Sequence, residues 1–253
     1  MTRTVCVSGA ASGIARALAE QLRAEGHRVI SVDQRDADVV ADLSTADGRA
    51  SAVDGVLDAC NGRLDGLAAL AGVGPQVGAA AQASVNFFGA KALLEGLRPA
   101  LALGEAPAAI VASSVAATIA PYDEAVVDAC LADDEGAAVE LSGKIDGGVG
   151  YAGSKRALAL YVRRNAPSWA AQGIRINALA PGNTHTQLTA GALADAQFGP
   201  LMEAVPVPRG SWAEASEIAS AAAWALSPAA SFLIGSFLVI DGGTDALVRP
   251  DVF

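Results

Sequence analysis

Cysteine and histidine are scarce in this chain of 253 residues, which holds three cysteines and two histidines. Cys6, Cys60 and Cys130 are odd in number and far apart, so a disulfide framework is not indicated. With so few ligands and no characteristic spacing, a zinc site is not indicated either. We therefore expect no metal site and reduced thiols, as in a cytoplasmic protein.

Positive charge and aromatic side chains are also in short supply. Lysine and arginine number 17 against 27 acidic residues, which gives a net charge of −10, and aromatic residues make up 5%. The excess of negative charge argues against a nucleic-acid partner and counts against an acidic carrier protein as substrate. The 52% of hydrophobic residues is nevertheless typical of a compact globular protein.

The chain lacks long uninterrupted hydrophobic runs. Glycine, proline or a charge breaks every apolar stretch before it reaches the length that spans a membrane. Residues 1–5 lead straight into a strand-like segment, so no signal peptide is indicated. We expect a cytoplasmic protein without membrane attachment.

What the sequence does contain is a regular alternation of β-type and helical patterns. Continuous apolar runs are typical of parallel strands that are covered on both faces, and repeated βαβ units predict a doubly wound α/β sheet. We expect one Rossmann-type domain over residues 1–253, with a seven-stranded parallel sheet and helices on both faces. The strand candidates are 4–7, 28–32, 39–41, 64–70, 108–113, 174–179 and 237–240. The helix candidates are 13–25, 46–59, 80–97, 150–171 and 213–226.

Two segments interrupt this alternation. Residues 118–149 contain an acidic cluster and two adjacent glycines, and their middle part, 123–142, has the pattern of two short helices. Residues 184–209 are polar and punctuated by proline. Because long excursions from a compact domain are often functional, we expect residues 186–205 to form a substrate lid. The candidate lining residues of this lid are Leu188, Leu193, Phe198, Leu201 and Met202.

A glycine-rich turn, Ser8-Gly9-Ala10-Ala11-Ser12-Gly13-Ile14-Ala15, follows the first predicted strand. Gly9 permits a tight turn, and Gly13 lets a phosphate approach the opening of a helix, whose free N–H groups and dipole favour an anion. Turns rich in glycine and serine are abundant in proteins. This one, however, lies at the first βα crossover, where dinucleotides bind, so we expect a dinucleotide here.

Acidic residues follow the second and third predicted strands. Asp33 stands 20 residues after the second glycine of the turn, where a carboxylate accepts hydrogen bonds from the adenosine ribose and repels a 2′-phosphate. This predicts NAD(H) rather than NADP(H), although Arg35 nearby is of the type that accommodates the phosphate. Asp42 and Leu43 follow the third strand, and Asp42 is either an adenine contact or an N-terminal helix cap.

Tyr151 and Lys155 are four residues apart and lie on the same face of a predicted helix. A phenol titrates near pH ~10, and an adjacent ammonium favours the phenolate and lowers that pKa. Such a pair can transfer a proton near neutral pH, although tyrosine and lysine at this spacing are also common on ordinary half-exposed helix faces. Ser114 stands at the carboxyl end of the fifth predicted strand, the sheet edge at which ligands bind, and its hydroxyl is a candidate to hold a substrate oxygen.

Taken together, the glycine-rich turn and the ordered Ser…Tyr-x-x-x-Lys set resemble the short-chain dehydrogenase/reductase family. The resemblance covers nearly the whole chain, from Ser8 to Asp241-Gly242-Gly243. It implies hydride transfer between a nicotinamide cofactor, NAD, and a secondary alcohol or ketone. It also implies the catalytic roles. By this resemblance Ser114 polarises the substrate oxygen and Tyr151 is the acid/base. Lys155 lowers the pKa of Tyr151 and binds the nicotinamide ribose, and Asn86 supports a proton-relay water.

The same resemblance assigns cofactor contacts beyond the turn. Pro181 and Gly182, with Thr184 and Thr186, match the segment that contacts the nicotinamide carboxamide. His185, within that segment, is expected to be a loop residue or a contact at the substrate mouth. The candidate cofactor-binding residues are Gly9, Ser12, Gly13, Ile14, Asp33, Asp42, Leu43, Ala71, Gly72, Tyr151, Lys155, Pro181, Gly182, Thr184 and Thr186.

The gap from Ser114 to Tyr151 is unusually long for the family, at 37 residues (151 − 114), because it contains the acidic segment 118–149. This insertion resembles the bacterial 3-alpha-hydroxysteroid dehydrogenase/carbonyl reductase subgroup, which implies substrates that are often bulky, cyclic or aromatic. The insertion is expected to shape one wall of the active-site mouth, to replace a helix-pair subunit interface common in the family, or both. We expect a homodimer or homotetramer, with the last helix and final strand as a contact surface.

Two other functions are compatible with this fold. A non-catalytic NAD-binding scaffold or regulator would use the same architecture, but it would not need Ser114, Tyr151, Lys155 and Asn86 together. A related enzyme without net hydride transfer is the third hypothesis. Loss of Lys155 or of the dinucleotide turn would have favoured it, and both are present.

Overall fold

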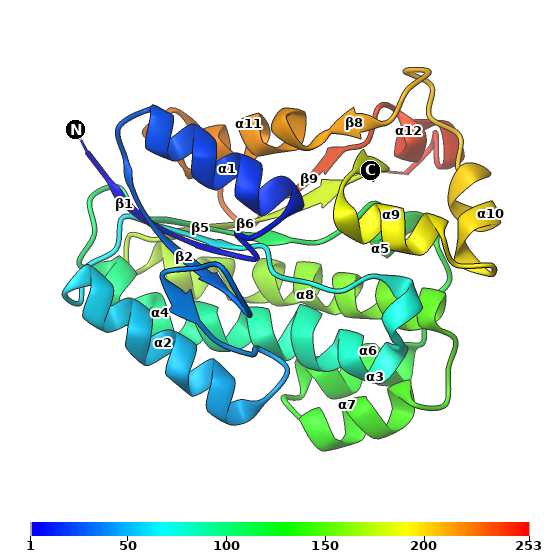
Figure 1. Cartoon of the computed structure of the whole chain (residues 1–253), viewed down its shortest axis with the longest axis horizontal. Coiled ribbons are helices and arrows are strands. Elements are labelled where there is room, and N and C mark those ends of the chain that lie inside the picture. Colours follow the sequence, from blue (N-terminus) through cyan, green and yellow to red (C-terminus); the bar gives the residue numbers. More distant parts are fainter. Residues whose placement is uncertain (1, 253) are drawn as a thin grey trace.

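Seven parallel strands form the sheet at the centre of the protein (Figure 1). The computed structural model describes residues 2–252, and the strand order is β3-β2-β1-β4-β5-β6-β9. The chain order reverses at β1, which pairs with β2 on one side and with β4 on the other. Such a switch point is where doubly wound sheets bind dinucleotides. The strands are β1 Thr4–Ser8, β2 Arg28–Asp33, β3 Val39–Val40, β4 Gly66–Ala69, β5 Ala108–Ala112, β6 Arg175–Pro181 and β9 Phe237–Ile240.

Helices cover both faces of this sheet (Figure 1). On one face, α1 (Gly13–Ala24) and α11 (Ala215–Leu226) pack against each other over one hydrophobic cluster. On the other face, α2 (Ala46–Cys60), α4 (Ala90–Ala102) and α8 (Gly147–Ala170) cover a second, larger cluster. Because the central strands are buried on both sides, their apolar runs do not alternate. The predicted fold class is confirmed.

The helix predicted over residues 80–97 differs most from its prediction. It consists of α3 (Ala79–Gln82), a π-helical stretch (Ala83–Gly89) and α4, which continues through Pro99 to Ala102. A π-helical stretch shifts side chains around the axis, and such stretches are frequent at functional sites. This one carries Asn86.

The insertion contains the two short helices predicted for its middle part. A short α5 (Ala116–Ile119) precedes α6 (Glu124–Leu131) and α7 (Glu135–Ser142). Each of the two longer helices begins at an aspartate cap, because the Asp123 side chain accepts from Val126 N at 3.0 Å and the Asp134 side chain accepts from Ala137 N at 2.9 Å. The pair packs against α8 and the π-helical stretch, on the side of the molecule away from the sheet (Figure 1).

Several short elements gather at the carboxyl end of the sheet. A two-stranded pair joins β7 (Thr184–His185) to β8 (Ala213–Glu214). Between them lie α9 (Gln187–Leu193) and α10 (Phe198–Glu203), and α12 (Thr244–Val248) follows β9. The segment predicted to be a lid, 186–205, consists mainly of the two short helices α9 and α10.

Within residues 2–252, no helix is long and apolar enough to cross a membrane.

Candidate active site

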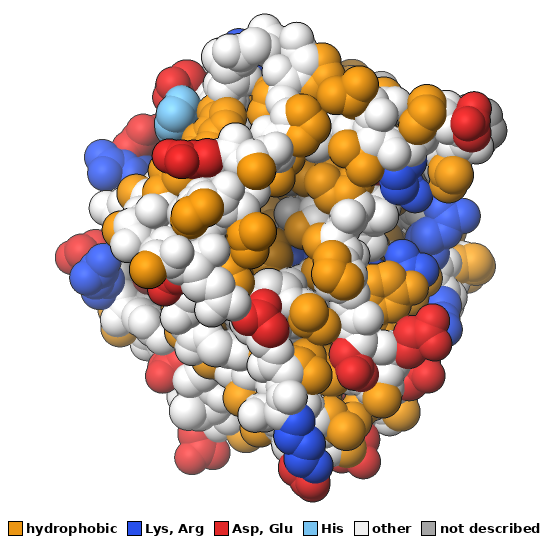
Figure 2. All heavy atoms as spheres, turned by 90° about the vertical axis from the view of Figure 1, so that its right-hand side faces the viewer, with side chains coloured by type: hydrophobic (Ala, Val, Ile, Leu, Met, Phe, Trp, Pro, Cys, Tyr) orange, Lys and Arg blue, Asp and Glu red, His pale blue; other side chains and the backbone are white. Residues whose placement is uncertain are grey.

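A cavity of about 680 Å³ opens at the carboxyl end of the sheet, beneath α9 and α10. Figure 2 shows it as a hollow with hydrophobic side chains around it. All of the predicted site residues line this cavity except Asn86 and Asp42. The predicted residues in the wall are Gly9, Ser12, Gly13, Ile14, Asp33, Leu43, Ala71, Gly72, Ser114, Tyr151, Lys155, Pro181, Gly182, Thr184 and Thr186.

The turn after β1 brings two strand ends into close contact. Gly9 has a φ of 78°, and a Cβ atom there would lie 2.9 Å from the Cα of Ala71, so only glycine fits. The Ser8 hydroxyl accepts from the backbone N–H groups of Leu70 and Ala71, both at 3.1 Å. This serine thus ties β1 to the segment after β4 and shapes the wall at the switch point.

The first turn of α1 is open to an anionic group. Ser12 is the N-cap residue, but its hydroxyl makes no capping hydrogen bond to the helix, and no acidic residue stands in the first turn. The free N–H groups and the helix dipole therefore face the cavity without a competing carboxylate. Such an end fits the pyrophosphate of a dinucleotide.

Asp33 lies at the end of β2, where the sequence places it. Its Oδ2 accepts from Ala11 N at 3.0 Å and its Oδ1 from Gln34 N at 2.7 Å. The carboxylate is therefore held beside the glycine-rich turn with acceptor capacity left for a hydroxyl group. Arg35 is exposed and lies outside the cavity wall.

Of the two roles expected for Asp42, the structure contradicts the helix cap, and the adenine contact stays a prediction. The cap of α2 is Thr45, whose hydroxyl accepts from Gly48 N at 3.0 Å, so the cap hypothesis for Asp42 is wrong. Its Oδ1 instead accepts from Ser44 N and from the Gln34 side chain. These hydrogen bonds hold the pKa of Asp42 below its usual value. Its neighbour Leu43 lines the cavity.

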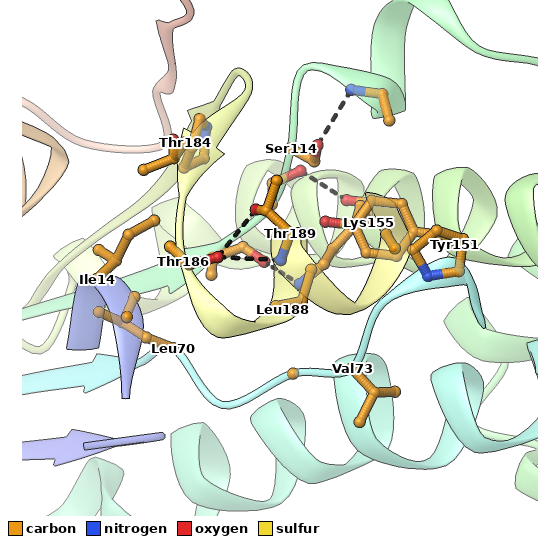
Figure 3. A pocket seen from close by; sticks show the side chains of 18 of the residues that line it. Ile14, Leu70, Val73, Ser114, Tyr151, Lys155, Thr184, Thr186, Leu188 and Thr189 are labelled. Atoms are coloured by element: carbon orange, nitrogen blue, oxygen red, sulfur yellow. Dashed lines mark hydrogen bonds between the residues drawn. The ribbon is translucent and has the colours of Figure 1, made fainter. Parts of the chain in front are cut away.

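Ser114, Tyr151 and Lys155 converge at the opposite end of the cavity, where they face α9 (Figure 3). Ser114 follows β5, and its hydroxyl accepts from Ala116 N at 3.2 Å. Tyr151 and Lys155 lie one turn apart on α8, with Lys155 Nζ 5.7 Å from the centroid of the Tyr151 ring. The ammonium donates to the Ala112 carbonyl at 2.8 Å, which ties Lys155 on α8 to the end of β5.

The pKa of Tyr151 is shifted in the direction opposite to the sequence-based expectation. Burial raises it above the ordinary 10.0, and hydrogen bonding with Ser114 only partly offsets this. Burial also lowers the pKa of Lys155 from 10.5 to about 8. The net shift of the Tyr151 pKa is therefore upward because burial dominates, and the role of Lys155 in favouring the phenolate stays a prediction. At neutral pH the phenol carries its proton and can donate it.

Asn86 lies behind this wall and holds its backbone in place. It is completely buried, its Oδ1 accepts from Val73 N at 2.8 Å, and its Nδ2 donates to the Val73 carbonyl at 3.2 Å. A Cβ atom on Gly72 would lie 2.9 Å from Asn86 Oδ1 and 3.2 Å from Lys155 Nζ. Asn86 and Lys155 therefore meet across Gly72, and the relay role of Asn86 stays a prediction.

The wall continues from the end of β6 into the lid. The Thr184 hydroxyl donates to the Gly182 carbonyl at 2.9 Å. Thr186 caps α9, accepting from Thr189 N at 3.2 Å, and its hydroxyl lies 2.9 Å from that of Thr189 (Figure 3). A Cβ atom on Gly13 would lie 3.3 Å from Thr186. The start of the lid therefore lies against the glycine-rich turn.

The part of the cavity beyond Ser114 and Tyr151 is largely apolar. Of the predicted lid residues, all but Leu193 line it. Sequence reasoning did not name the other residues here, because they come from separate loops without a common pattern. These are Val73, Pro75, Ile119, Pro121, Val149 and Val205. Since Ile119, Pro121 and Val149 belong to segment 118–149, the insertion does shape one wall of the cavity.

His185 does not line the cavity. It lies exposed on β7, with its ring centroid 5.5 Å from that of Trp212. Within residues 2–252 there is no group of three or more potential metal ligands. Among the described residues, the ionisable side chains in the cavity wall are Asp33, Tyr151 and Lys155, together with Asp146 at its mouth.

The chain is similar to known dehydrogenases over its full length. It is 44% identical to the 3-alpha-hydroxysteroid dehydrogenase/carbonyl reductase of Comamonas testosteroni, over 98% of this chain and 99% of that protein. The 3-alpha-hydroxysteroid dehydrogenase of Pseudomonas sp. B-0831, solved in complex with NADH, superimposes with a TM-score of 0.97 at 44% identity, covering 99% and 100% of the two chains. Levodione reductase superimposes with a TM-score of 0.76 at 25% identity, covering 96% and 98%.

A family profile described as enoyl-(acyl carrier protein) reductase matches residues 131–245. A full-length relationship at 44% identity leaves no doubt about ancestry, and the site geometry agrees with it. The chain belongs to the short-chain dehydrogenase/reductase family.

Proposed function

We propose that this protein is an NAD(H)-dependent oxidoreductase that interconverts a secondary alcohol and a ketone. The observation that supports this most is the convergence of a proton-carrying Tyr151, the Ser114 hydroxyl and the Lys155 ammonium at one end of a cavity. The other end of that cavity is the glycine-rich turn and the open end of α1. Both relatives at 44% identity are named as dehydrogenases.

NAD(H) rather than NADP(H) is proposed because of the charge at the adenosine end. The Asp33 carboxylate is fixed beside the turn by two backbone N–H groups, and it repels a 2′-phosphate. Arg35 does not line the cavity and so does not counterbalance it. The Pseudomonas relative was solved with NADH.

The proposed substrate is a bulky, neutral ketone or secondary alcohol. Over residues 2–252 the cavity wall contains one cationic side chain, Lys155, which stands at the reacting end. The walls beyond Tyr151 are aliphatic and aromatic, and Asp146 is the acidic group at the mouth. An apolar wall and an acidic mouth favour neutral cyclic or aromatic compounds and disfavour carboxylates, phosphates and acidic carrier proteins.

In the reductive direction, the protein supplies orientation and a proton. A bound nicotinamide ring supplies the hydride from its C4 atom. Ser114 donates a hydrogen bond to the substrate oxygen, and Tyr151 donates its proton to that oxygen as negative charge develops there. The ammonium of Lys155, near the Tyr151 ring, stabilises the phenolate that is left. Oxidation of the alcohol reverses these steps.

The proposal is tested by following NADH absorbance with purified protein and a set of ketones. We expect turnover with neutral cyclic or aromatic ketones, at least tenfold lower kcat/KM with matched keto acids, and a clear preference for NADH over NADPH. A preference for NADPH would contradict the role of Asp33. Binding of NADH without turnover of any ketone or alcohol would favour a scaffold instead.

The exposed edge of the sheet supports a homodimer or homotetramer. β9 is an edge strand, and beside it large hydrophobic side chains are exposed, with Phe232 fully accessible. The insertion covers another face, because α6 packs against α8 and α7 packs against α3 and the π-helical stretch. The contact surface that we propose is formed by α11 and β9. The exposed residues here are Trp224, Phe232, Ile234 and Val239.

Light scattering tests the oligomeric state. We expect the wild type to be an oligomer and Phe232→Asp to shift it towards the monomer, because a buried unpaired charge weakens an interface. Leu103→Asp is the matched control, since Leu103 is also highly exposed but lies at the end of α4. A monomeric wild type, or an effect of equal size in the control, would contradict the proposed surface.

A further inference from the structure

We propose that Glu135 of the insertion acts through Arg49 to position the adenine end of the dinucleotide site. The inference rests on the proposed NAD(H) function and adds a positioning residue to it. It assigns the insertion a task at the far end of the cavity from the substrate. The residues concerned are 86 positions apart in the chain and meet only in the fold.

Arg49 holds the loop between β3 and α2. It is 8% exposed, its Nε donates to the Leu43 carbonyl at 2.9 Å, and its Nη2 donates to the Ser44 carbonyl at 3.2 Å. Leu43 is buried and lines the cavity on the side of Asp33. The guanidinium therefore fixes the backbone of a residue in the cavity wall.

The charge of Arg49 is balanced by the insertion. Glu135, the first residue of α7, accepts from Arg49 Nη1 at 2.7 Å through Oε2 and from Nη2 through Oε1. A bidentate pair fixes both the place and the plane of a guanidinium. Because Arg49 is buried, loss of the carboxylate leaves an uncompensated charge. The guanidinium is then expected to turn towards water and to release the carbonyls of Leu43 and Ser44.

The same guanidinium also lies close to a second segment that contributes to the cavity wall. It lies 6.0 Å from the ring centroid of Phe88, in the π-helical stretch whose Val85 lines the cavity. Arg49 thus contacts two segments that contribute wall residues, one with Leu43 and one with Val85, whereas Tyr151 stands at the other end of the cavity. The effect of Glu135 should be confined to the adenosine half of the dinucleotide.

The test is Glu135→Gln, with ligand binding measured by calorimetry. We expect the Kd of NADH and of ADP-ribose to rise about tenfold. The Kd of reduced nicotinamide mononucleotide, which lacks the adenosine half, and kcat at saturating NADH should not change. Glu135 has a side chain 34% exposed, so the variant is expected to fold. Arg49→Lys is a second variant with the same expected pattern, since lysine cannot make the same set of bonds.

Asp133→Asn is the matched control. Asp133 also ties the insertion to the core, through Lys91 Nζ at 2.8 Å, but neither residue lines the cavity. Its φ of 64° is well tolerated by asparagine. We expect no change in any of the three dissociation constants. Unchanged ADP-ribose binding in Glu135→Gln, or equal weakening of the mononucleotide, would overturn the positioning role. A wild type that does not bind NADH would instead overturn the proposed function.

Discussion

Replacing Tyr151 with phenylalanine is expected to lower kcat about a thousandfold in both directions, because positioned acid–base catalysis contributes factors of about 10² to 10⁴. The change removes one oxygen atom and keeps the ring that packs on α8. NADH binding should therefore persist. The measurement is steady-state turnover of a ketone, combined with a titration of NADH fluorescence in the same variant.

Tyr161→Phe is the control for this change. Tyr161 also lies on α8, is buried and bonds to Glu95, but it does not line the cavity, so we expect turnover close to that of the wild type. A Tyr151→Phe protein that folds, binds NADH and retains normal turnover would contradict the acid/base assignment.

The raised pKa of Tyr151 also sets a pH dependence. Since the protein's own groups keep the phenol protonated at neutral pH, ketone reduction finds its acid ready, whereas alcohol oxidation needs the phenolate. The oxidative kcat should therefore rise with pH through the neutral and mildly alkaline range more steeply than the reductive kcat. Initial rates in both directions across that range check this trend.

Replacing Lys155 with methionine is expected to inactivate the protein and to stabilise its fold. Turnover should fall at least about a hundredfold, because the phenolate of Tyr151 loses its neighbouring cation. Burial lowers the pKa of Lys155 from 10.5 to about 8, so at pH 7 the folded state carries a charge that it disfavours. The corresponding cost is roughly 3 kcal/mol, less the packing and the bond to Ala112 that are lost.

The sign of this effect follows from proton binding. The folded pKa is below the unfolded one, so between about pH 8 and 10.5 the unfolded state binds more protons and this group makes stability rise with pH. The stability advantage of Lys155→Met should therefore be largest below pH 8 and shrink above it. Urea unfolding at pH 7 and pH 9.5 measures it. Lys91→Met, which removes a lysine outside the cavity, should keep activity without gaining stability.

The parts of the site that were predicted from the sequence are those that local chemistry determines. Gly9 must take a positive φ next to Ala71, and Asp33 must end the second strand, so a strand–turn–helix reading places both. Helix spacing places Tyr151 and Lys155 on one face, and the resemblance to the family identified them as catalytic. The carboxyl ends of parallel strands then bring Ser114 to the same edge.

The parts that were not predicted depend on contacts between distant segments. The direction of the pKa shift of Tyr151 comes from its burial, which no local pattern reveals. The cap of α2 is Thr45 rather than Asp42, because the loop after β3 continues past Asp42 before the helix begins. The pairing of Arg49 with Glu135 joins residues that share no motif.

The most direct test of the account is the fate of a deuterium label. NADH carrying deuterium at C4, in each of its two stereoisomers, is incubated with the protein and a neutral cyclic ketone, and the alcohol is examined by NMR. The account predicts that one isomer alone delivers its deuterium to the carbinol carbon, while the hydroxyl proton comes from solvent. An alcohol without deuterium at that carbon from either isomer, or no alcohol at all from ketones that fit the cavity, would contradict it.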